Sequence, residues 1–553
     1  MNPEDSSASN GRSNGQRRKE PSLDPPTYIL NQHGARVLDP TNAVRAPGQP
    51  SVRPTVYVGS QLLVRDGHVS SVRQPLTEAA RSLGLSAEFV PIDPELLAIA
   101  RRHKLTELAD RVLINRVVLT PATDQPAAPP DAWAVLQTFR SLLPKDDPRA
   151  HQVTLEHLMA ASESGQLQGN PFMQGGPFMQ GGPFMQGGPF MQGGPFMQGG
   201  SVTSQYGMPG FGGRAPVKWL GAEPDRCGDE LMATRRPVVA VLDTGAGLHP
   251  WLPNSIVDRV AEVAGLSVGM TDPTTNPEVT GALNSPLEGT LDSDSGHGTF
   301  IAGIIRQLCP DANILAVRVM YSDGVVQEGD LLRAVSRLLF RQELARLLDR
   351  PELLVDVLSM SLGYYHESPS DVAFDQLLLA PLEELGRRGV AVVASAGNDS
   401  TPRHMYPAGF TPNPEGPVFH PQADLVPVVS VGALNPDDET IALFSNAGDW
   451  VTCHRAGVSV VSTMPITFNA SLQPGAKLFV QGDGTRALID MDDYRGGFAT
   501  WSGTSFSAPV LAGQIAQHLI SSGSLGSMDV ARAVSSGWSA LGALVGLDRP
   551  PVA

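Results

Sequence analysis

Three short segments in the second half of the 553-residue chain place an aspartate, a histidine and a serine among small residues. Asp243 lies in Val-Leu-Asp-Thr-Gly, His297 in Gly-His-Gly-Thr, and Ser505 in Gly-Thr-Ser-Phe-Ser-Ala-Pro. A serine hydroxyl becomes a good nucleophile when an imidazole takes its proton, and a carboxylate fixes the tautomer of that imidazole. The three residue types therefore predict acyl transfer through a covalent intermediate on Ser505.

The neighbouring residues predict the elements that would position these side chains. The apolar run 238–242 predicts a buried parallel strand, which puts Asp243 at the carboxyl edge of a sheet, where open α/β sheets bind ligands. His297 would project from the first turn of a helix, because the apolar residues after it have helical spacing. Ser505 stands at the start of another predicted helix with Pro509 in its first turn, where the helix dipole favours a developing negative charge.

Each of these residues alone also has an ordinary structural explanation. An aspartate after a strand can cap a turn, a histidine at a helix start is commonly structural, and a serine is a common N-cap. Asn398 follows the apolar run 390–393 and could either stabilise a turn or donate a hydrogen bond to a carbonyl oxygen that becomes negative. Only the combination of the four segments favours a catalytic site.

Together the four segments resemble those of subtilisin-like serine proteases, over about residues 215–540. The order Asp, His, Ser is that of subtilisin and differs from the orders in chymotrypsin and the α/β-hydrolases. The resemblance implies that Asp243 orients His297 and that His297 is the general base and then the general acid. It implies that Ser505 is the nucleophile and that Asn398 and the backbone N–H of Ser505 form an oxyanion hole.

The resemblance also implies a site for a peptide, which would bind by adding a strand. Residues 359–363 resemble the substrate-binding edge strand of the family, and residues 395–397 resemble the opposite wall of the pocket for the residue before the scissile bond. No acidic residue lies in either segment, so we expect an apolar or broadly tolerant pocket. The expected substrate-binding residues are Ser361, Leu362, Gly363, Ser395, Ala396 and Gly397.

The expected fold class is α/β, because continuous apolar runs alternate with amphipathic helical patterns after Arg214. We expect a doubly wound, mostly parallel sheet with helices on both faces, similar to subtilisin, preceded by a small α+β domain. The expected divisions are a disordered tail 1–50, a small α+β domain 51–163, a flexible linker 164–214, a catalytic domain 215–540 and a C-terminal tail 541–553.

The small domain has the position and character of the prodomains that such proteases carry. We expect it to be an intramolecular inhibitor or folding aid, with a tail near residues 158–160 reaching the cleft; the alternative is a recruitment module. Within it, 97–109 predicts one helix and 151–158 a strand. The linker repeats Pro-Phe-Met-Gln-Gly-Gly five times from Pro171 to Gly200, as a flexible spacer or as a multivalent apolar segment.

Composition excludes several classes of partner and compartment. A net charge of −16 argues against nucleic-acid binding. Three cysteines cannot form a disulfide framework, and no apolar run resembles a signal peptide or a membrane span. We therefore expect a cytoplasmic protein with a polypeptide substrate and no membrane partner; the alternative is export by a route that the sequence does not reveal.

We expect no required cofactor and no metal site. Calcium sites are common in the family, but none maps onto this sequence. An insertion at 463–498 that we expect to form a hairpin beside the cleft carries Asp490, Asp492 and Asp493, either as calcium ligands or as a solvated acidic loop. Cys453 and His454 form an adjacent pair that is weak evidence for a second site. The expected function is that of a serine endopeptidase; the alternative is a degenerate protease that acts as a peptide-binding or scaffold protein.

Overall fold

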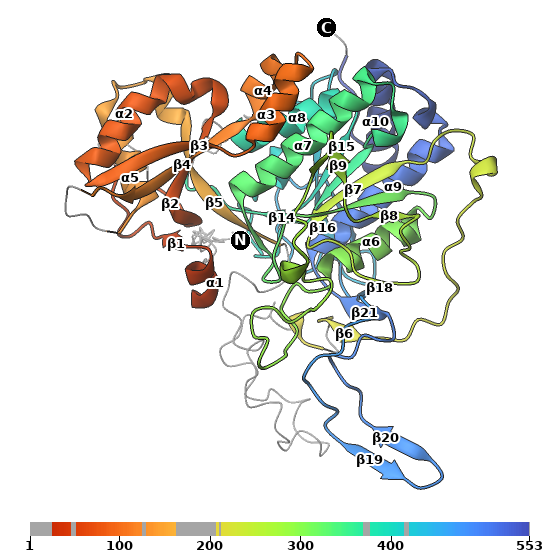
Figure 1. Cartoon of the computed structure of the whole chain (residues 1–553). Coiled ribbons are helices and arrows are strands. Elements are labelled where there is room, and N and C mark those ends of the chain that lie inside the picture. The colour runs from red at the N-terminus through yellow and green to blue at the C-terminus, as the bar shows by residue number, and fades with distance from the viewer. Residues whose placement is uncertain are drawn as a thin grey trace, which may run out of the picture.

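The computed structural model describes residues 25–45, 51–123, 129–161, 206–209, 212–368, 376–413 and 420–551 (Figure 1). The repeats lie wholly outside these residues. Part of the tail 1–50, for which the sequence predicts disorder, is described and contains helix α1 Thr27–Gln32 and strand β1 Ala35–Leu38, which pairs with residues 55–58, so the prediction is wrong for this part. Helix α10, Val530–Val545, crosses the start expected for the C-terminal tail, since Leu541 is buried in the core. Among the described helices, none has the length and hydrophobicity that a membrane span requires.

A parallel sheet forms the centre of the larger domain, and its strand order is β17-β16-β15-β13-β7-β11-β8. Side chains alternate between its faces: Val239 and Val241 pack with helices α6 and α9, whereas Ala240 and Leu242 share a core with α7 and α8. This arrangement confirms the predicted doubly wound α/β class. The strands are β7 Val238–Asp243, β8 Val257–Asp258, β11 Asn313–Arg318, β13 Val357–Met360, β15 Ala391–Ser395, β16 Val428–Leu434 and β17 Cys453–Ala456.

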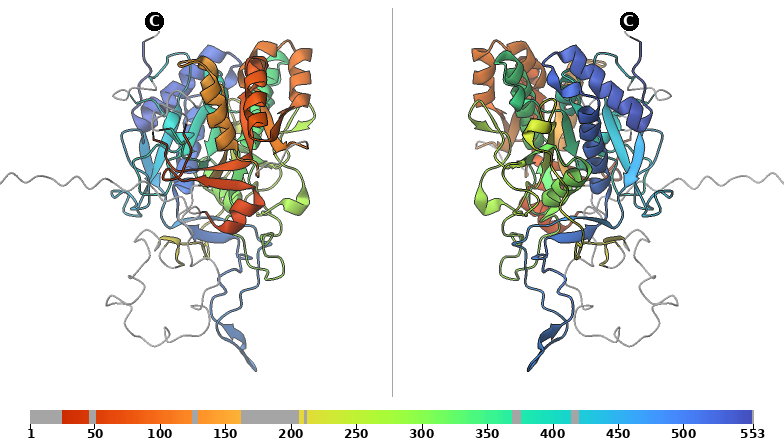
Figure 2. Two further views of the ribbon diagram at one scale, coloured as in Figure 1. Left: turned by 90° about the vertical axis from the view of Figure 1, so that its left-hand side faces the viewer. Right: turned by 90° about the vertical axis from the view of Figure 1, so that its right-hand side faces the viewer.

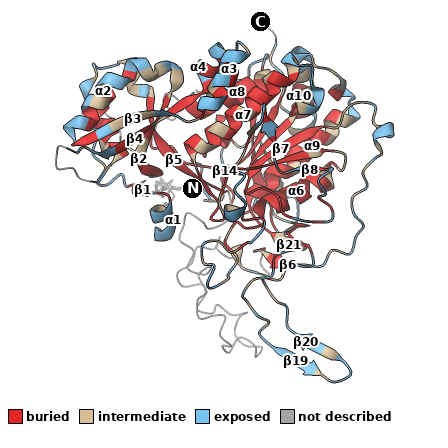
Figure 3. Cartoon of the chain, in the orientation of Figure 1, coloured by how far each residue is buried: buried red, intermediate tan, exposed pale blue. Residues whose placement is uncertain are grey.

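The helices of this domain explain why the strands are buried (Figure 3). Two helices, α6 and α9, pack against each other so closely that a Cβ on Gly513 would lie 2.6 Å from the Cβ of Leu308. On the other face, α7 packs against α8. The bounds are α6 His297–Leu308, α7 Glu328–Leu347, α8 Gln376–Arg387 and α9 Thr504–Ser521.

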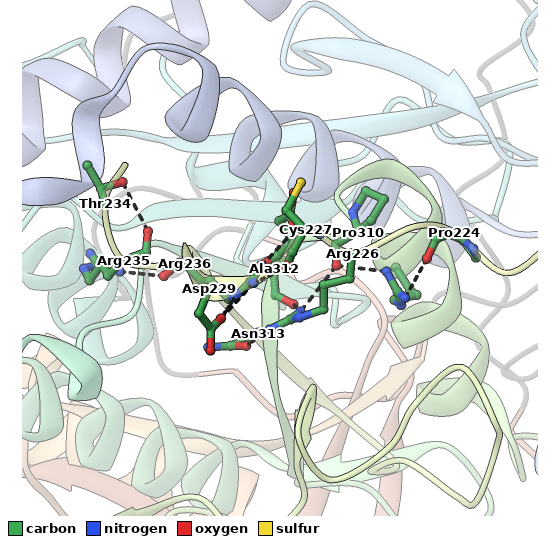
Figure 4. Close-up of polar contacts among 12 residues, drawn as sticks. Pro224, Arg226, Cys227, Asp229, Thr234, Arg235, Arg236, Pro310, Ala312 and Asn313 are labelled. Carbon is green, nitrogen blue, oxygen red and sulfur yellow. Dashed lines mark hydrogen bonds and ion pairs between the residues drawn. The ribbon is translucent and has the colours of Figure 1, made fainter. Parts of the chain in front are cut away.

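Arginines fix the segment before β7 to the amino edge of the sheet (Figure 4). Arg226 donates to the carbonyl oxygen of Ala312 at 2.7 Å and to the side chain of Asn313 at 2.6 Å. Arg235 donates to both carboxylate oxygens of Asp356, at 2.6 and 2.7 Å, and Asp356 also accepts the backbone N–H of Val238 at 2.8 Å. Strand β7 is therefore fixed at its start, and its other end carries Asp243.

The smaller domain is an antiparallel sheet, β5-β2-β4-β3, with α2 and α5 packed on one face. Its other face packs toward α7 and α8 of the larger domain. The predicted helix 97–109 is wrong in one respect: it is two helices, because Lys104 has φ +61°, a left-handed conformation that ends a helix. The elements are α1 Thr27–Gln32, β1 Ala35–Leu38, β2 Thr55–Arg65, α2 Val69–Ser82, β3 Leu85–Pro91, α3 Pro94–Arg102, α4 Thr106–Val112, β4 Ile114–Pro121, α5 Ala132–Leu142 and β5 Val153–Ala161.

The insertion before Ser505 forms a hairpin arm that extends away from the body of the molecule (Figure 2). Its tip is exposed, and Phe479 is 74% accessible. The arm extends from a small sheet, β18-β21-β6. The remaining strands are β6 Ala215–Pro216, β9 Glu262–Val263, β10 Leu266–Ser267, β12 Val325–Gln327, β14 Leu362–Gly363, β18 Val460–Thr463, β19 Lys477–Val480, β20 Gly484–Ala487 and β21 Phe498–Trp501.

Candidate active site

Strand β7 and helix α6 bring Asp243 and His297 together. Both side chains are fully buried, and Nδ1 of His297 lies 2.7 Å from Oδ1 of Asp243. The same oxygen accepts the backbone N–H of Thr244 at 2.8 Å, and the hydroxyl oxygen of Thr244 lies 3.1 Å from it. The approach requires glycine at 298, because a Cβ there would lie 2.1 Å from the carbonyl oxygen of Gly245. The imidazole is thus held with Nδ1–H toward the carboxylate.

Ser505 occupies the first turn of α9, the helix that packs beside α6. The ring of the next residue, Phe506, lies 5.3 Å from the ring of His297. The Oγ of Ser505 is 3.4 Å from the carbonyl oxygen of Ser361, and the Ser361 hydroxyl donates to the carbonyl of Ser505 at 2.9 Å. The three predicted triad segments therefore meet at one edge of the sheet.

Asn398 follows β15 at the same edge. Its carboxamide oxygen accepts the backbone N–H of Thr504 at 3.0 Å and the hydroxyl of Thr504 at 2.9 Å. Because two donors of Thr504 engage the oxygen, the NH₂ group lies on the other side of the carboxamide. This orientation leaves the side chain able to act as a hydrogen-bond donor toward a reacting carbonyl.

The six residues expected to bind substrate are all buried and form two facing walls, one at β14 and one after β15. Sequence reasoning missed Met405, which lies between these walls. A Cβ on Gly363 would be 2.7 Å from Cε of Met405, and a Cβ on Gly397 would be 2.8 Å from its Sδ. Met405 thus fills the space that the two walls enclose. No local pattern around Met405 indicates this position.

Strand β5 of the smaller domain enters the larger domain between β12 and β14. It is antiparallel to both: Ala160 faces Val325 on one side and Gly363 on the other. The backbone N–H of Ala161 donates to the carbonyl of Gly324 at 2.8 Å. The segment expected near residues 158–160 therefore lies along the predicted substrate strand.

A buried histidine fixes this inserted strand by its charge. His157 places Nδ1 at 2.7 Å from Oε2 of Glu328 and Nε2 at 2.9 Å from Oε2 of Glu367, and its ring stacks on Tyr364. Burial lowers the pKa of His157, but the two carboxylates outweigh burial and raise the pKa to about 10. At neutral pH the imidazole is therefore a cation between two anions of the larger domain.

Of the described residues, His157, His366 and Glu367 are the group whose donor atoms lie close enough to hold a metal ion. However, Nδ1 of His366 accepts the backbone N–H of Ser368 at 3.0 Å, so Nε2 carries the ring proton. That proton points toward the carboxylate of Glu367, which would have to bind the metal ion. The hydrogen bonds of the cluster therefore favour a bound proton over a bound metal.

The two weaker sequence candidates have ordinary surroundings. Asp493 pairs with Arg495, and Asp492 accepts the backbone N–H of Leu472, while burial and the neighbouring Asp490 raise the pKa of Asp492 to about 6. Burial raises the pKa of the Cys453 thiol to about 11, which keeps it protonated and poorly nucleophilic.

Comparisons with known proteins agree with this geometry. A model of the subtilase family, Peptidase_S8, matches residues 234–533, more than half of the chain. Serine protease AprX of Bacillus subtilis (strain 168) is 25% identical over 304 residues, which are 50% of this chain and 55% of that protein. The intracellular serine protease of Paenibacillus polymyxa is 27% identical over 297 residues, 50% of this chain and 65% of that protein. The chain thus spans about half to two thirds of these relatives.

Among solved structures, a cold adapted subtilisin-like serine proteinase is 20% identical and covers 55% of this chain and 82% of its own, with a TM-score of 0.31. The family match covers the strands and helices that carry Asp243, His297, Asn398 and Ser505. The chain belongs to the subtilase family.

Proposed function

We propose that this chain is a serine endopeptidase that hydrolyses peptide bonds through an acyl-enzyme on Ser505. The observation that carries the proposal is the buried pair of Asp243 and His297, 2.7 Å apart, at the sheet edge where helix α9 presents Ser505. The alternative of a degenerate, peptide-binding protein is not favoured, because Asp243, His297 and Ser505 are all present and their segments meet at one edge of the sheet.

In this mechanism, Oγ of Ser505 attacks the scissile carbonyl while its proton passes to Nε2 of His297. Asp243 stabilises the imidazolium that results. The NH₂ group of Asn398 and the backbone N–H of Ser505 stabilise the tetrahedral oxyanion, helped by the N-terminus of α9. His297 then protonates the leaving amine. A water molecule, deprotonated by His297, hydrolyses the ester and restores the Ser505 hydroxyl.

We further propose that the substrate is an extended polypeptide with a small side chain before the scissile bond. The peptide would take the place of β5 between β12 and β14, where backbone hydrogen bonds give affinity. The pocket between Gly363 and Gly397 already holds Met405. Because Met405 occupies this space, we propose a preference for small side chains before the scissile bond. This preference is narrower than that of the apolar or broadly tolerant pocket expected from the sequence.

The smaller domain would act as an intramolecular inhibitor of this site. Strand β5 occupies the peptide position, and His297 and Ser505 have no accessible surface in the closed chain. In the register of β5 on β14, Ala161 pairs with Leu362, which is next to Ser361, and the carbonyl of Ser361 lies beside the Oγ of Ser505. We propose that the first bond cut is in this chain itself, within a few residues after Ala161.

We also propose a reducing, cytoplasmic compartment and no required cofactor. All three cysteines, Cys227, Cys309 and Cys453, carry free thiols. An oxidising compartment would favour disulfides in a secreted protein.

Labelling with a fluorophosphonate probe tests the mechanism on the full chain. We expect the wild type to label at Ser505, to cleave itself and then to cleave peptides, whereas Ser505→Ala does none of these. A folded wild type that neither labels nor cleaves any peptide would overturn the proposal. Equal activity in wild type and Ser505→Ala would assign the chemistry to another residue.

A further inference from the structure

A buried carboxyl group outside the triad lies one side chain away from it. Glu278 comes from the loop between β10 and α6, and only 1% of its surface is exposed. One oxygen accepts the hydroxyl of Thr244 and the other accepts the hydroxyl of Thr299, each at 2.5 Å. A carboxyl group this deeply buried is costly unless its hydrogen bonds are strong. The two short bonds satisfy this requirement.

These two threonines flank the triad residues in the sequence and in space. Thr244 follows Asp243 and donates its backbone N–H to that carboxylate, and its hydroxyl oxygen accepts the N–H of Gly298, next to His297. Thr299 lies in the first turn of α6 and accepts the N–H of Gly247 at 2.6 Å. Glu278 therefore ties the loop after β7 to the helix that carries His297.

The hydroxyl of Thr244 has a single proton to donate. Its oxygen lies 2.5 Å from Glu278 and 3.1 Å from Asp243, so when Glu278 is ionised the proton lies on the shorter bond, the one to Glu278. Oδ1 of Asp243 then accepts from the backbone N–H of Thr244 and faces Nδ1 of His297. A protonated Glu278 would instead donate to Thr244 and turn that hydroxyl toward Asp243, which would weaken the carboxylate that stabilises the imidazolium.

Electrostatics link the same group to the histidine. Burial raises the pKa of Glu278, the hydroxyls of Thr244 and Thr299 oppose that increase, and the charges of Asp243 and His297 act in opposite directions. The interaction of Glu278 with the imidazolium is attractive. A negative charge on Glu278 therefore favours the protonated form of His297.

We propose that Glu278 is a positioning residue for the triad: it locks Thr244 and Thr299 around Asp243 and His297, and its charge adjusts the basicity of the imidazole. This inference rests on the proposed function of the triad. Within the described part of the chain, the carboxyl group of Glu278 bonds to Thr244 and Thr299 and not to Ser505 or β5, so its effect acts through the two threonines.

The test compares fluorophosphonate labelling rates of the full chain across pH for wild type, Glu278→Gln and Glu278→Asp. Glutamine keeps the shape of the side chain and removes its charge, so we expect the labelling rate to fall about 10- to 50-fold. The acid limb of the plot of rate against pH should lie about half a pH unit lower. Aspartate keeps the charge, but its side chain is one methylene shorter and does not reach both threonines. We therefore expect a slower labelling rate with the acid limb of the pH profile unchanged.

The control is Asp356→Asn, which weakens a carboxylate at the opposite edge of the same sheet. It should lower Tm at least as much as Glu278→Gln without moving the pH profile. A folded Glu278→Gln with wild-type rate and wild-type acid limb would overturn the proposal, and if that variant does not fold, an unchanged rate in Glu278→Asp would do so. If Ser505→Ala labels as fast as the wild type, the proposed function fails instead.

Discussion

Two sheets of the molecule, the central parallel sheet and the sheet that the two domains share, are held together by different forces. The central parallel sheet, which carries Asp243, has apolar residues on both faces and keeps its charged groups at its edges. The sheet shared by the two domains, β12-β5-β14, is antiparallel and has His157 buried between Glu328 and Glu367. Apolar surface stays unfavourable in water, whereas buried charges regain hydration when they separate. The shared sheet therefore differs from the central sheet in its buried charges, although Leu158 and Met159 of β5 also pack in the apolar core with α7 and α8.

The largest effect is expected in the central sheet, from Asp243→Asn. The amide presents the wrong hydrogen-bond partner to Nδ1 of His297 and disturbs the tautomer, so we expect peptide hydrolysis to fall by about 10⁴-fold. The structure of the shared sheet should not change. Hydrolysis rates together with hydrogen exchange of β5 check both points, and faster exchange of β5 in Asp243→Asn would show that the two sheets are not independent.

The next effect is expected in the shared sheet, from His157→Leu. This change leaves Glu328 and Glu367 buried without their cation, which costs about 3–5 kcal/mol. The equilibrium constant for opening of β5 should therefore rise by about 10²- to 10³-fold. Hydrogen exchange of β5, measured in a Ser505→Ala chain that cannot cut itself, gives this opening equilibrium. His103→Leu, in the same domain but away from the joint, is the matched control. Equal protection in the two variants would contradict the role of His157.

The same joint should respond to pH. The pKa of His157 is raised from 6.5 to about 10, so its contribution is complete below about pH 6.5 and disappears as pH rises toward 10. Burial raises the pKa of Glu367, but the neighbouring His366 and His157 lower it by a larger amount. The net result is a pKa well below the usual 4.5. The contribution of Glu367 is therefore present above about pH 4.5 and is lost in more acidic solution.

We therefore expect β5 to be most protected between about pH 4.5 and 6.5 and to open by roughly 10²-fold by pH 9. Hydrogen exchange in the Ser505→Ala chain, corrected for intrinsic exchange, separates this effect from titration of His297. The central strand β7 serves as the internal reference. A β5 protection that stays constant from pH 6 to 9 would show that His157 does not set the stability of the joint.

The smallest effect is expected where the two regions meet, at Met405. Met405→Ala opens space between Gly363 and Gly397, so hydrolysis of peptides with phenylalanine before the scissile bond should gain about tenfold relative to alanine peptides. Met405→Leu, which keeps the volume, is the control. The ratio of kcat/KM for the two peptides measures the change. An unchanged ratio in Met405→Ala would place the specificity pocket elsewhere.

The sequence indicated the central sheet better than the shared one. Asp243, His297 and Ser505 lie in local patterns of small residues at strand ends and helix starts, and periodicity alone predicts those elements. The joint depends on His157, Glu328 and Glu367, which are far apart in the chain and lie in no motif. Glu278 and Met405 also depend on long-range contacts that spacing does not show.

Local conformation explains the other differences. Apolar spacing continues across 97–109, but the left-handed residue Lys104 divides that segment into α3 and α4. The insertion before Ser505 does contain the expected hairpin, formed by β19 and β20, yet the arm extends away from the body instead of lying beside the cleft.

The place where β5 ends decides how the chain would be divided. Ala161 is in the cleft, and the next described residue, Tyr206, packs edge-on against Phe444 of the larger domain at 4.9 Å between ring centres. The five Phe-Met repeats lie between these two points in the sequence. A cut just after Ala161 would leave every repeat on the half that carries Ser505. The released enzyme would then carry the phenylalanine and methionine side chains of all five repeats near its new amino terminus. The N-terminal fragment would carry no copy of the repeat.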